Sequence, residues 1–242
     1  MVFVNYYTDS PEENVALDEL LLIKAENGFM EGSLRFWESS EYFVVAGRAS
    51  VIEEDCFSLI CRGDGVKIIR RVSGGGTVLQ GPGCLNFSLI LPYPDGLKYT
   101  DIKGSYEWIL KRLSGALSVP GRSIEVLPVS DLVIGGRKIS GNAQARKRGF
   151  FLHHGTFLTG FDLSKISRYL KHPPKEPAYR QKREHADFLA DIPVEKKEIK
   201  ETVKKLFLGD TVREWAPERE DLDGLAYLVE KKYSRAEWNY MF

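Results

Sequence analysis

Residues 70–78 read RRVSGGGTV and directly follow the apolar run 66–69, which is typical of a β-strand. Three consecutive glycines are costly in backbone entropy, so a backbone without side chains must be needed at this point. Such a loop lets amide groups converge on an anion, and an arginine before it can donate a bidentate pair of hydrogen bonds to phosphate. Taken alone, the stretch is as consistent with a glycine-rich turn that binds nothing. It matches neither the P-loop nor the GxGxxG pattern.

A second informative stretch, SDLVIGGRKISGNAQ, covers residues 130–144. It predicts a β-hairpin whose two-residue turn is Gly135 and Gly136. Lys138 lies just after this turn, where a fixed ammonium beside bound phosphate would stabilise the charge that develops in acyl-phosphate chemistry. Asp131 lies across the hairpin and could hold this lysine or a magnesium ion. The alternative interpretation is that Arg137 and Lys138 are solvated turn residues.

A third stretch, FFLHHGTFL at residues 150–158, predicts a strand with two adjacent histidines. Adjacent residues of a strand point to opposite faces, so His153 and His154 cannot both bind one metal ion. We expect one histidine to line the pocket through hydrogen bonds and the other to pack or to face solvent.

Helices are predicted at both ends of the chain. Ser10, Pro11 and Glu13 form a capping-box pattern, which predicts a helix that ends near Gly28. Apolar residues at helical spacing predict a second helix over 101–117. The C-terminal helices are expected over 194–208 and 216–232. Prolines exclude a regular element through the basic segment 172–183, which we interpret as an ordered connecting loop.

The predicted fold class is α+β, with a mixed or antiparallel sheet and flanking helices, because few of the strands are separated by full helices. Further strands are expected in short apolar runs, which cover residues 34–37, 42–46 and 87–91. We expect one domain over 1–242, with a sheet core over 1–190 and a helical subregion over 191–242.

Composition excludes several classes. The 242 residues are 43% apolar and 28% charged, which is ordinary for a globular protein. Lys plus Arg and Asp plus Glu both number 34, so no global field attracts nucleic acid or an anionic membrane. Cys56, Cys61 and Cys84 fit neither a disulfide framework nor metal-ligand spacing. Without a signal peptide or a membrane-spanning run, we expect a soluble, cytoplasmic monomer.

Together, RRVSGGGTV, GRKISGNAQ and HHGTFL, in this order and at this spacing, resemble the lipoate–protein ligase A family. This family belongs to the wider biotin/lipoate ligase and octanoyltransferase superfamily. Residues 14–19 are similar to the family's N-terminal helix, Phe36-Trp37-Glu38 to its first strands, and residues 232–239 to the end of its catalytic domain. The resemblance covers nearly the whole chain and implies the fold of a biotin/lipoate ligase catalytic domain.

The resemblance implies a reaction in two steps. Lipoic acid and ATP, with Mg²⁺, give an acyl adenylate and pyrophosphate, and the acyl group then passes to a lysine of a lipoyl acceptor domain. The acceptor would be of the 2-oxoacid dehydrogenase E2 type or the glycine-cleavage H protein type. Lys138 would contact the carboxyl and phosphate oxygens, and Asp131 would position it.

The resemblance also implies two sets of binding residues. ATP and the adenylate would bind to Arg71, Ser73, Gly74, Gly75, Gly76, Thr77, Val78, Leu79 and Lys138. The acyl chain would lie along the sheet near Trp37, Val45 and Val78, with Gly141, Ala143 and His154 as further pocket candidates.

Two departures from the family leave alternatives open. Full ligases carry a C-terminal accessory domain that these 242 residues do not contain, so a separate accessory chain is a candidate partner. An octanoyltransferase would take octanoate from acyl carrier protein without ATP, but it needs a catalytic cysteine, and only Cys84 is available. A non-catalytic lipoyl-binding protein is the third alternative. The pattern does not decide between lipoate and octanoate, and the basic residues Lys175, Arg180, Lys182 and Arg183 either face an acidic carrier domain or are solvated.

Overall fold

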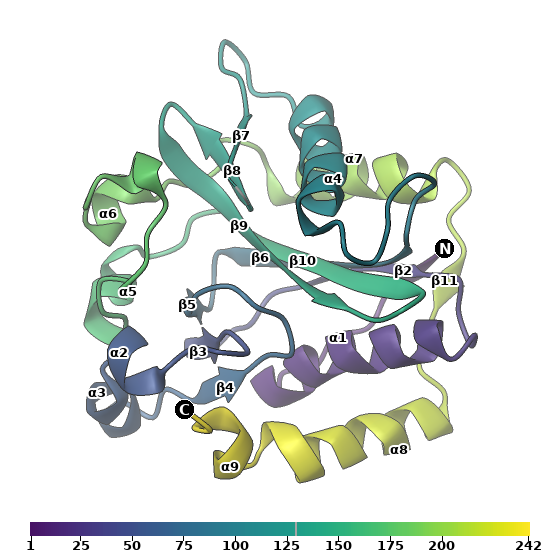
Figure 1. The fold of residues 1–242 in the computed structure, drawn as a ribbon, viewed down its shortest axis with the longest axis horizontal. Coiled ribbons are helices and arrows are strands. Elements are labelled where there is room, and N and C mark those ends of the chain that lie inside the picture. The colour runs from purple at the N-terminus through teal and green to yellow at the C-terminus, as the bar shows by residue number, and fades with distance from the viewer. Residues whose placement is uncertain (129) are drawn as a thin grey trace.

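The computed structural model describes residues 1–128 and 130–242. Two sheets organise it (Figure 1), with strand orders β11-β1-β2-β6-β10-β9-β8-β7 and β4-β3-β5. The strands are β1 (Val2–Val4), β2 (Ser33–Trp37), β3 (Phe43–Ala46), β4 (Ile68–Arg70), β5 (Val78–Gln80), β6 (Cys84–Pro92), β7 (Glu125–Leu127), β8 (Asp131–Ile134), β9 (Arg137–Arg146), β10 (Phe150–Leu158) and β11 (Glu214–Trp215). Strand β1 pairs in parallel with β2 and β11, whereas the other neighbours in the large sheet are antiparallel, so the predicted mixed sheet is confirmed.

Helices cover both faces of the large sheet, with α4 and α7 on one face and α1 and α8 on the other (Figure 1). The helices are α1 (Pro11–Glu26), α2 (Ile52–Asp55), α3 (Ser58–Gly63), α4 (Ile102–Ala116), α5 (Ser164–Tyr169), α6 (His185–Phe188), α7 (Lys196–Leu208), α8 (Arg219–Leu228) and α9 (Ala236–Asn239), with a 3₁₀ turn (Ala178–Arg180) and a π turn (Val229–Tyr233). No helix within the described ranges is long and apolar enough to cross a bilayer.

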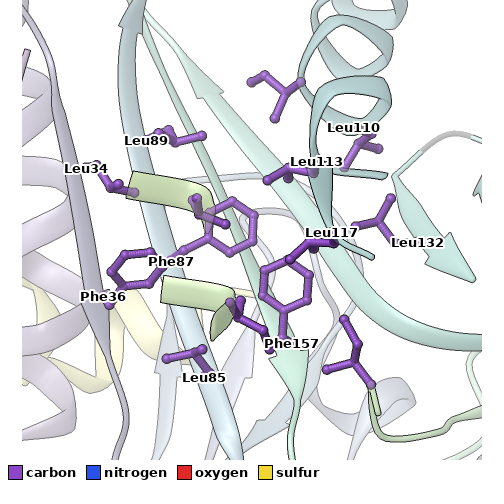
Figure 2. Packing of buried hydrophobic residues seen from close by; sticks show 14 of the residues in the cluster. Leu34, Phe36, Leu85, Phe87, Leu89, Leu110, Leu113, Leu117, Leu132 and Phe157 are labelled. Carbon is purple, nitrogen blue, oxygen red and sulfur yellow. The ribbon is translucent and has the colours of Figure 1, made fainter. Parts of the chain in front are cut away.

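The α4 face of the sheet carries the main apolar core. Phe87 and Phe157, on neighbouring strands, stack with ring centroids 5.3 Å apart. Figure 2 shows Leu113 of α4, and Leu117 just after this helix, beside the aromatic pair. Because side chains alternate along a strand, the residues between these core positions must point to the α1 face. The polar residues of the candidate site lie there.

Helix α1 begins as predicted, with one difference in its cap. Ser10 is the N-cap, its hydroxyl oxygen accepts the Glu13 amide at 3.3 Å, and Gly28 follows the helix with a φ of 81°. The capping-box pattern also predicts a hydrogen bond from the Ser10 amide to the Glu13 side chain. This part of the prediction is wrong, because the Ser10 amide donates to the Thr8 hydroxyl oxygen at 3.2 Å. The local signal therefore gives the correct start of the helix but not its complete hydrogen bonding.

The C-terminal fifth of the chain is not helical throughout. Between α7 and α8 in the sequence, β11 adds a strand to the large sheet, where Trp215 pairs with Val4 of β1. The helix expected from residue 216 begins at Arg219, after Pro217. Strands as short as β1 and β11 leave almost no alternation in the sequence, and their pairing with distant strands is what forms them.

The hairpin of β8 and β9 provides a test of the turn chemistry. Gly135 and Gly136 have φ values of 56° and 74°, which L-residues rarely adopt. We expect Gly136→Ala to lower the free energy of unfolding by about 1 kcal/mol, because an L-residue is strained in the left-handed region. Urea denaturation measures the change.

Gly115→Ala is the matched control. Gly115 lies in the last turn of α4, its φ is not among the positive values, and an added Cβ would meet nothing within 4 Å. The same chemical change should therefore stabilise the protein by about 0.5–1 kcal/mol through helix propensity. Equal effects of the two substitutions would contradict the assigned turn.

Candidate active site

Strand pairing places two rows of side chains on the α1 face of the large sheet. Residues paired directly across neighbouring strands share a face. One row consists of Arg35, Ser88, His154 and Ala143. The next row consists of Trp37, Asn86, Thr156, Gly141 and Asp131. Residues from the second and third sequence motifs thus share one face of the sheet.

Lys138 and Asp131 meet across the hairpin as predicted. The Lys138 Nζ lies 2.9 Å from Oδ1 of Asp131, and the carboxylate is buried. The lysine side chain crosses Gly141, because a Cβ built there would lie 2.7 Å from its Cε and 2.8 Å from its Nζ. The glycine in the sequence KISG therefore leaves the space that the lysine occupies.

Both oxygens of Asp131 are engaged. Oδ2 accepts the Tyr179 hydroxyl at 2.7 Å, while Oδ1 faces Lys138. Of the two predicted roles for Asp131, holding the lysine agrees with this geometry. A bond from Asp131 to magnesium stays a prediction. The described residues contain no cluster of three or more His, Cys, Asp or Glu suited to a metal ion.

The glycine loop is organised from behind by Arg71. This guanidinium is 7% exposed, and its Nη2 donates to the carbonyl oxygens of Gly74 and Gly76, the latter at 2.9 Å. Its Nε donates to Ser73 Oγ at 2.8 Å. Burial lowers the pKa of Arg71 to about 10, so the group stays charged at neutral pH.

This arrangement turns amide groups outward. In a trans peptide the carbonyl oxygen and the next amide point in opposite directions, so the amides of Gly75 and Thr77 point away from Arg71. Gly74, Gly75 and Gly76 are exposed, and the amides of Gly75 and Gly76 make no hydrogen bond with any residue in the described ranges. Exposed, unpaired amides in a glycine loop are suited to binding an anion.

A neighbouring loop fixes the position of the glycine loop. A Cβ added at Gly47 would lie only 1.9 Å from the carbonyl oxygen of Gly75, so the two backbones touch. The Arg48 amide donates to the Ser73 carbonyl oxygen at 2.8 Å. Glycine at position 47 is therefore a packing requirement of the site.

Arg70 links both loops to the C-terminal segment. Its fully buried guanidinium donates to the carbonyl oxygens of Gly47 at 2.7 Å, Ser50 at 2.8 Å and Asn239 at 3.1 Å. The Arg70 amide donates to Asn239 Oδ1 at 2.9 Å, and the Trp238 indole donates to the Arg70 carbonyl oxygen at 2.8 Å. Residues 238–239 thereby hold the strand that leads into the glycine loop.

His154 connects the loop to helix α1. Its Nε2 lies 2.6 Å from Ser73 Oγ and its Nδ1 lies 2.9 Å from Asp18 Oδ2. Burial alone would raise the pKa of Asp18, but the hydrogen bond from His154 and the charge of Arg35 outweigh it and hold that pKa below its usual value. An ionised carboxylate only accepts, so Nδ1 of His154 carries a proton and donates it to Asp18.

The expectation that His153 and His154 point to opposite faces of the sheet is confirmed. His153 points to the other face, where it is fully buried and hydrogen-bonds with Gln144 and Asn142. Burial lowers the pKa of His153 to about 3, so it stays neutral. Of the two histidines, His154 is the one that lies beside the glycine loop.

Other candidate residues are placed less uniformly. Trp37 and Val45 share one buried cluster, whereas Val78, the strand partner of Val45, is 38% exposed. The Leu79 side chain packs into a separate core cluster. Thr77 directs its hydroxyl to Ser50 and Asp55.

The basic loop is only partly available to a partner. Arg180 is 4% exposed, so neither alternative, facing a carrier domain or being solvated, holds for it, because the folded loop itself buries this guanidinium. Lys175 and Lys182 are exposed. Asp18 and Tyr179 are site residues that sequence reasoning missed, and no local pattern marks either of them.

The cysteines lie outside this chemistry. Cys56, Cys61 and Cys84 are all buried and free. Burial raises the pKa of the Cys84 thiol far above its ordinary value, so it is not a thiolate at neutral pH. Two surface hollows, of about 660 and 560 Å³, also lie elsewhere, since residues such as Pro120 and Pro193 line one and Phe29 and Trp215 the other.

Comparison with known proteins adds independent findings. The chain is 30% identical to lipoate–protein ligase 1 of Staphylococcus aureus over 246 residues, which cover 98% of this chain and 71% of that protein. It is 28% identical to the octanoyltransferase LipM of Lysinibacillus sphaericus, with 98% of each chain covered. Among solved structures, the bipartite lipoate protein ligase of Thermoplasma acidophilum, described with its E2 lipoyl domain, has a TM-score of 0.83 at 25% identity and covers 99% of this chain and 95% of that one.

Residues 10–207 match the family described as the lipoyl protein ligase A/B catalytic domain. This range contains the glycine loop, the Lys138 hairpin and the histidine strand. The expected fold of a lipoate ligase catalytic domain is confirmed by the structural likeness. The chain belongs to the lipoyl protein ligase A/B catalytic domain family, and it is an enzyme of the lipoate ligase and octanoyltransferase group.

Proposed function

We propose that this chain is an ATP-dependent lipoate–protein ligase. The carboxylate of lipoate, or of octanoate, attacks the α-phosphorus of ATP, which forms the acyl adenylate and releases pyrophosphate. The amine of a lysine on a lipoyl acceptor domain then attacks the acyl carbon, loses a proton and releases AMP. The acceptor is of the 2-oxoacid dehydrogenase E2 or glycine-cleavage H protein type. The relatives named lipoate–protein ligases support lipoate as the acid and a lipoylated protein as the product.

The Lys138 ammonium carries this proposal. It lies over Gly141 on the sheet face that the glycine loop covers, since a Cβ on Gly75 would lie 3.7 Å from the Cβ of Ala143. Gly141 and Ala143 are two residues apart on β9, so their positions are separated by roughly 7 Å. A fixed positive charge at this distance from the loop can stabilise a carboxylate and an α-phosphate that react between them.

The loop fits a nucleotide phosphate better than it fits a turn without a ligand. Arg71 turns amides toward the exposed side, and an added Cβ at Gly74 or Gly76 would meet nothing within 4 Å. Mg²⁺ would arrive bound by the phosphates of ATP. The outward amides and Lys138 would hold the phosphates.

The octanoyltransferase alternative rests on the match to LipM, which covers 98% of both chains. It requires a cysteine that carries the acyl group. Cys84 is fully buried, and its pKa is raised by that burial. The third alternative, a lipoyl-binding protein without catalysis, does not explain why Asp131 holds the Lys138 ammonium in a fixed position. Both observations favour the ligase.

Two donor conditions separate the first two functions. An unmodified lipoyl domain is incubated with the protein and either lipoic acid, ATP and magnesium, or octanoyl acyl carrier protein without ATP. We expect intact-mass spectra to show a lipoyl mass gain in the first condition alone. A gain only in the second condition would establish the transferase, and no gain in either would point to a missing accessory chain or to another acceptor.

Gly141→Ala tests the position of the lysine. The new Cβ would displace the Lys138 Cε and Nζ, which are the far end of a flexible side chain, so the fold should be retained. We expect ATP–pyrophosphate exchange to fall about a hundredfold, as after loss of one electrostatic stabiliser, and Lys138→Ala to have at least this effect. Normal exchange by Gly141→Ala, with an unchanged melting temperature, would contradict the proposed role of Lys138.

Cys84→Ala addresses the alternative directly. A ligase does not use this buried thiol, so the variant should retain lipoylation activity within about twofold of the wild type. The measurement is the initial rate of lipoyl transfer at equal concentrations of folded protein. Loss of octanoyl transfer from acyl carrier protein in this variant would instead favour the transferase.

A further inference from the structure

Tyr179 contacts the residue that holds Lys138, although it lies 48 residues further along the chain than Asp131. Its hydroxyl donates to Oδ2 of Asp131 at 2.7 Å, and Oδ1 faces the Lys138 Nζ at 2.9 Å. The two oxygens of one buried carboxylate therefore have partners from two separate segments.

We propose that Tyr179 is a positioning residue for the adenylation step, an inference that rests on the function proposed above. The terminal torsion of an aspartate is broad and roughly two-fold, so a carboxylate held at one oxygen can turn. Held at both oxygens, Asp131 keeps Oδ1 directed at Lys138. Because Gly141 bounds the lysine on its other side, the direction of the ammonium is set by a backbone and a fixed carboxylate.

Tyr179 is itself held in place. Its ring packs against Phe188, with centroids 5.2 Å apart. Its carbonyl oxygen accepts Nη2 of Arg183 at 2.8 Å, and the same nitrogen donates to the carbonyl oxygen of Gly136 at 3.0 Å. One guanidinium thus ties the tyrosine to the turn of the hairpin that carries Lys138.

The backbone between Tyr179 and Arg183 is strained. Gln181 and Lys182 have φ values of 53° and 58°, which are uncommon for residues other than glycine. Such conformations persist only where the surrounding contacts enforce them, and here the Lys182 amide donates to Glu176 Oε1 at 2.8 Å. The turn therefore returns Arg183 to Tyr179 at a conformational cost, as expected for a segment whose exact placement matters.

Tyr179 is a donor over the whole working range of pH. Its burial and the neighbouring Asp131 carboxylate raise the pKa of Tyr179 well above that of a free phenol. The hydroxyl therefore stays neutral and keeps its proton for Asp131.

Tyr179→Phe removes only this hydrogen bond. We expect kcat for ATP–pyrophosphate exchange to fall roughly tenfold, the effect of one hydrogen bond to a charged group. The KM values for ATP and lipoate should stay within about twofold, because the bond orients a group that acts in the transition state. Tyr227→Phe is the matched control, since Tyr227 is 62% exposed and should behave as the wild type. An unchanged kcat in Tyr179→Phe, or a loss confined to KM, would overturn the proposal.

A second measurement does not depend on activity. The protein is labelled with ¹³C at the lysine Cε, and the Lys138 signal is assigned by its disappearance in Lys138→Arg. A fixed side chain gives two distinct Hε shifts in the wild type, and we expect them to merge in Tyr179→Phe, where the ammonium is less restrained. Distinct shifts in both proteins would refute the role of Tyr179. If the wild type catalyses no exchange, the proposed function fails, and this spectrum alone decides whether Tyr179 fixes Lys138.

Discussion

The pairing of β10 with β6 on one side and β9 on the other is the constraint from which the site follows. A slip by one residue turns every side chain of a strand to the opposite face. Such a slip would put His153 under the glycine loop and direct Phe157 away from Phe87 and the core. The aromatic packing on the α4 face therefore enforces the polar arrangement on the α1 face. The register of β10 with β6 and β9 therefore determines both the apolar core and the candidate site.

Buried arginines fix the loops that the strands leave free. Arg35, Arg70 and Arg71 are each less than 8% exposed, and each donates to backbone carbonyl oxygens. A guanidinium carries five N–H groups in a rigid fork, so one buried charge can hold several peptide groups at once. Desolvating such a charge is costly, and it persists only where nearly all of its donors are satisfied. The glycine loop owes its shape to the contacts of Arg70 and Arg71, which regular secondary structure does not provide there.

Local signals explain how far the sequence could predict this structure. The helix that begins after Ser10, the turn at Gly135 and Gly136, and the opposed histidines each depend on a few neighbouring residues, and the structure contains all three. The contacts that complete the site join residues far apart in sequence. His154 and Asp18 are separated by 136 residues, and Arg70 and Asn239 by 169. Short strands such as β11 were missed for the same reason, since their partners decide their conformation. The exposure of Val78 and the burial of Arg180 likewise depend on how loops pack, which the spacing of apolar residues in the sequence does not predict.

The contacts of Trp238 and Asn239 with Arg70 affect the order in which parts of the protein can fold. Chains emerge from the ribosome with the N-terminal part first, and folding begins before synthesis ends. The residues of the glycine loop and of strands β1 to β10 are all synthesised before residues 238 and 239. Until those residues are made, the Arg70 guanidinium lacks two of its carbonyl acceptors and its amide lacks Asn239. The glycine loop therefore reaches its final position only after a segment far along the chain has docked against the sheet.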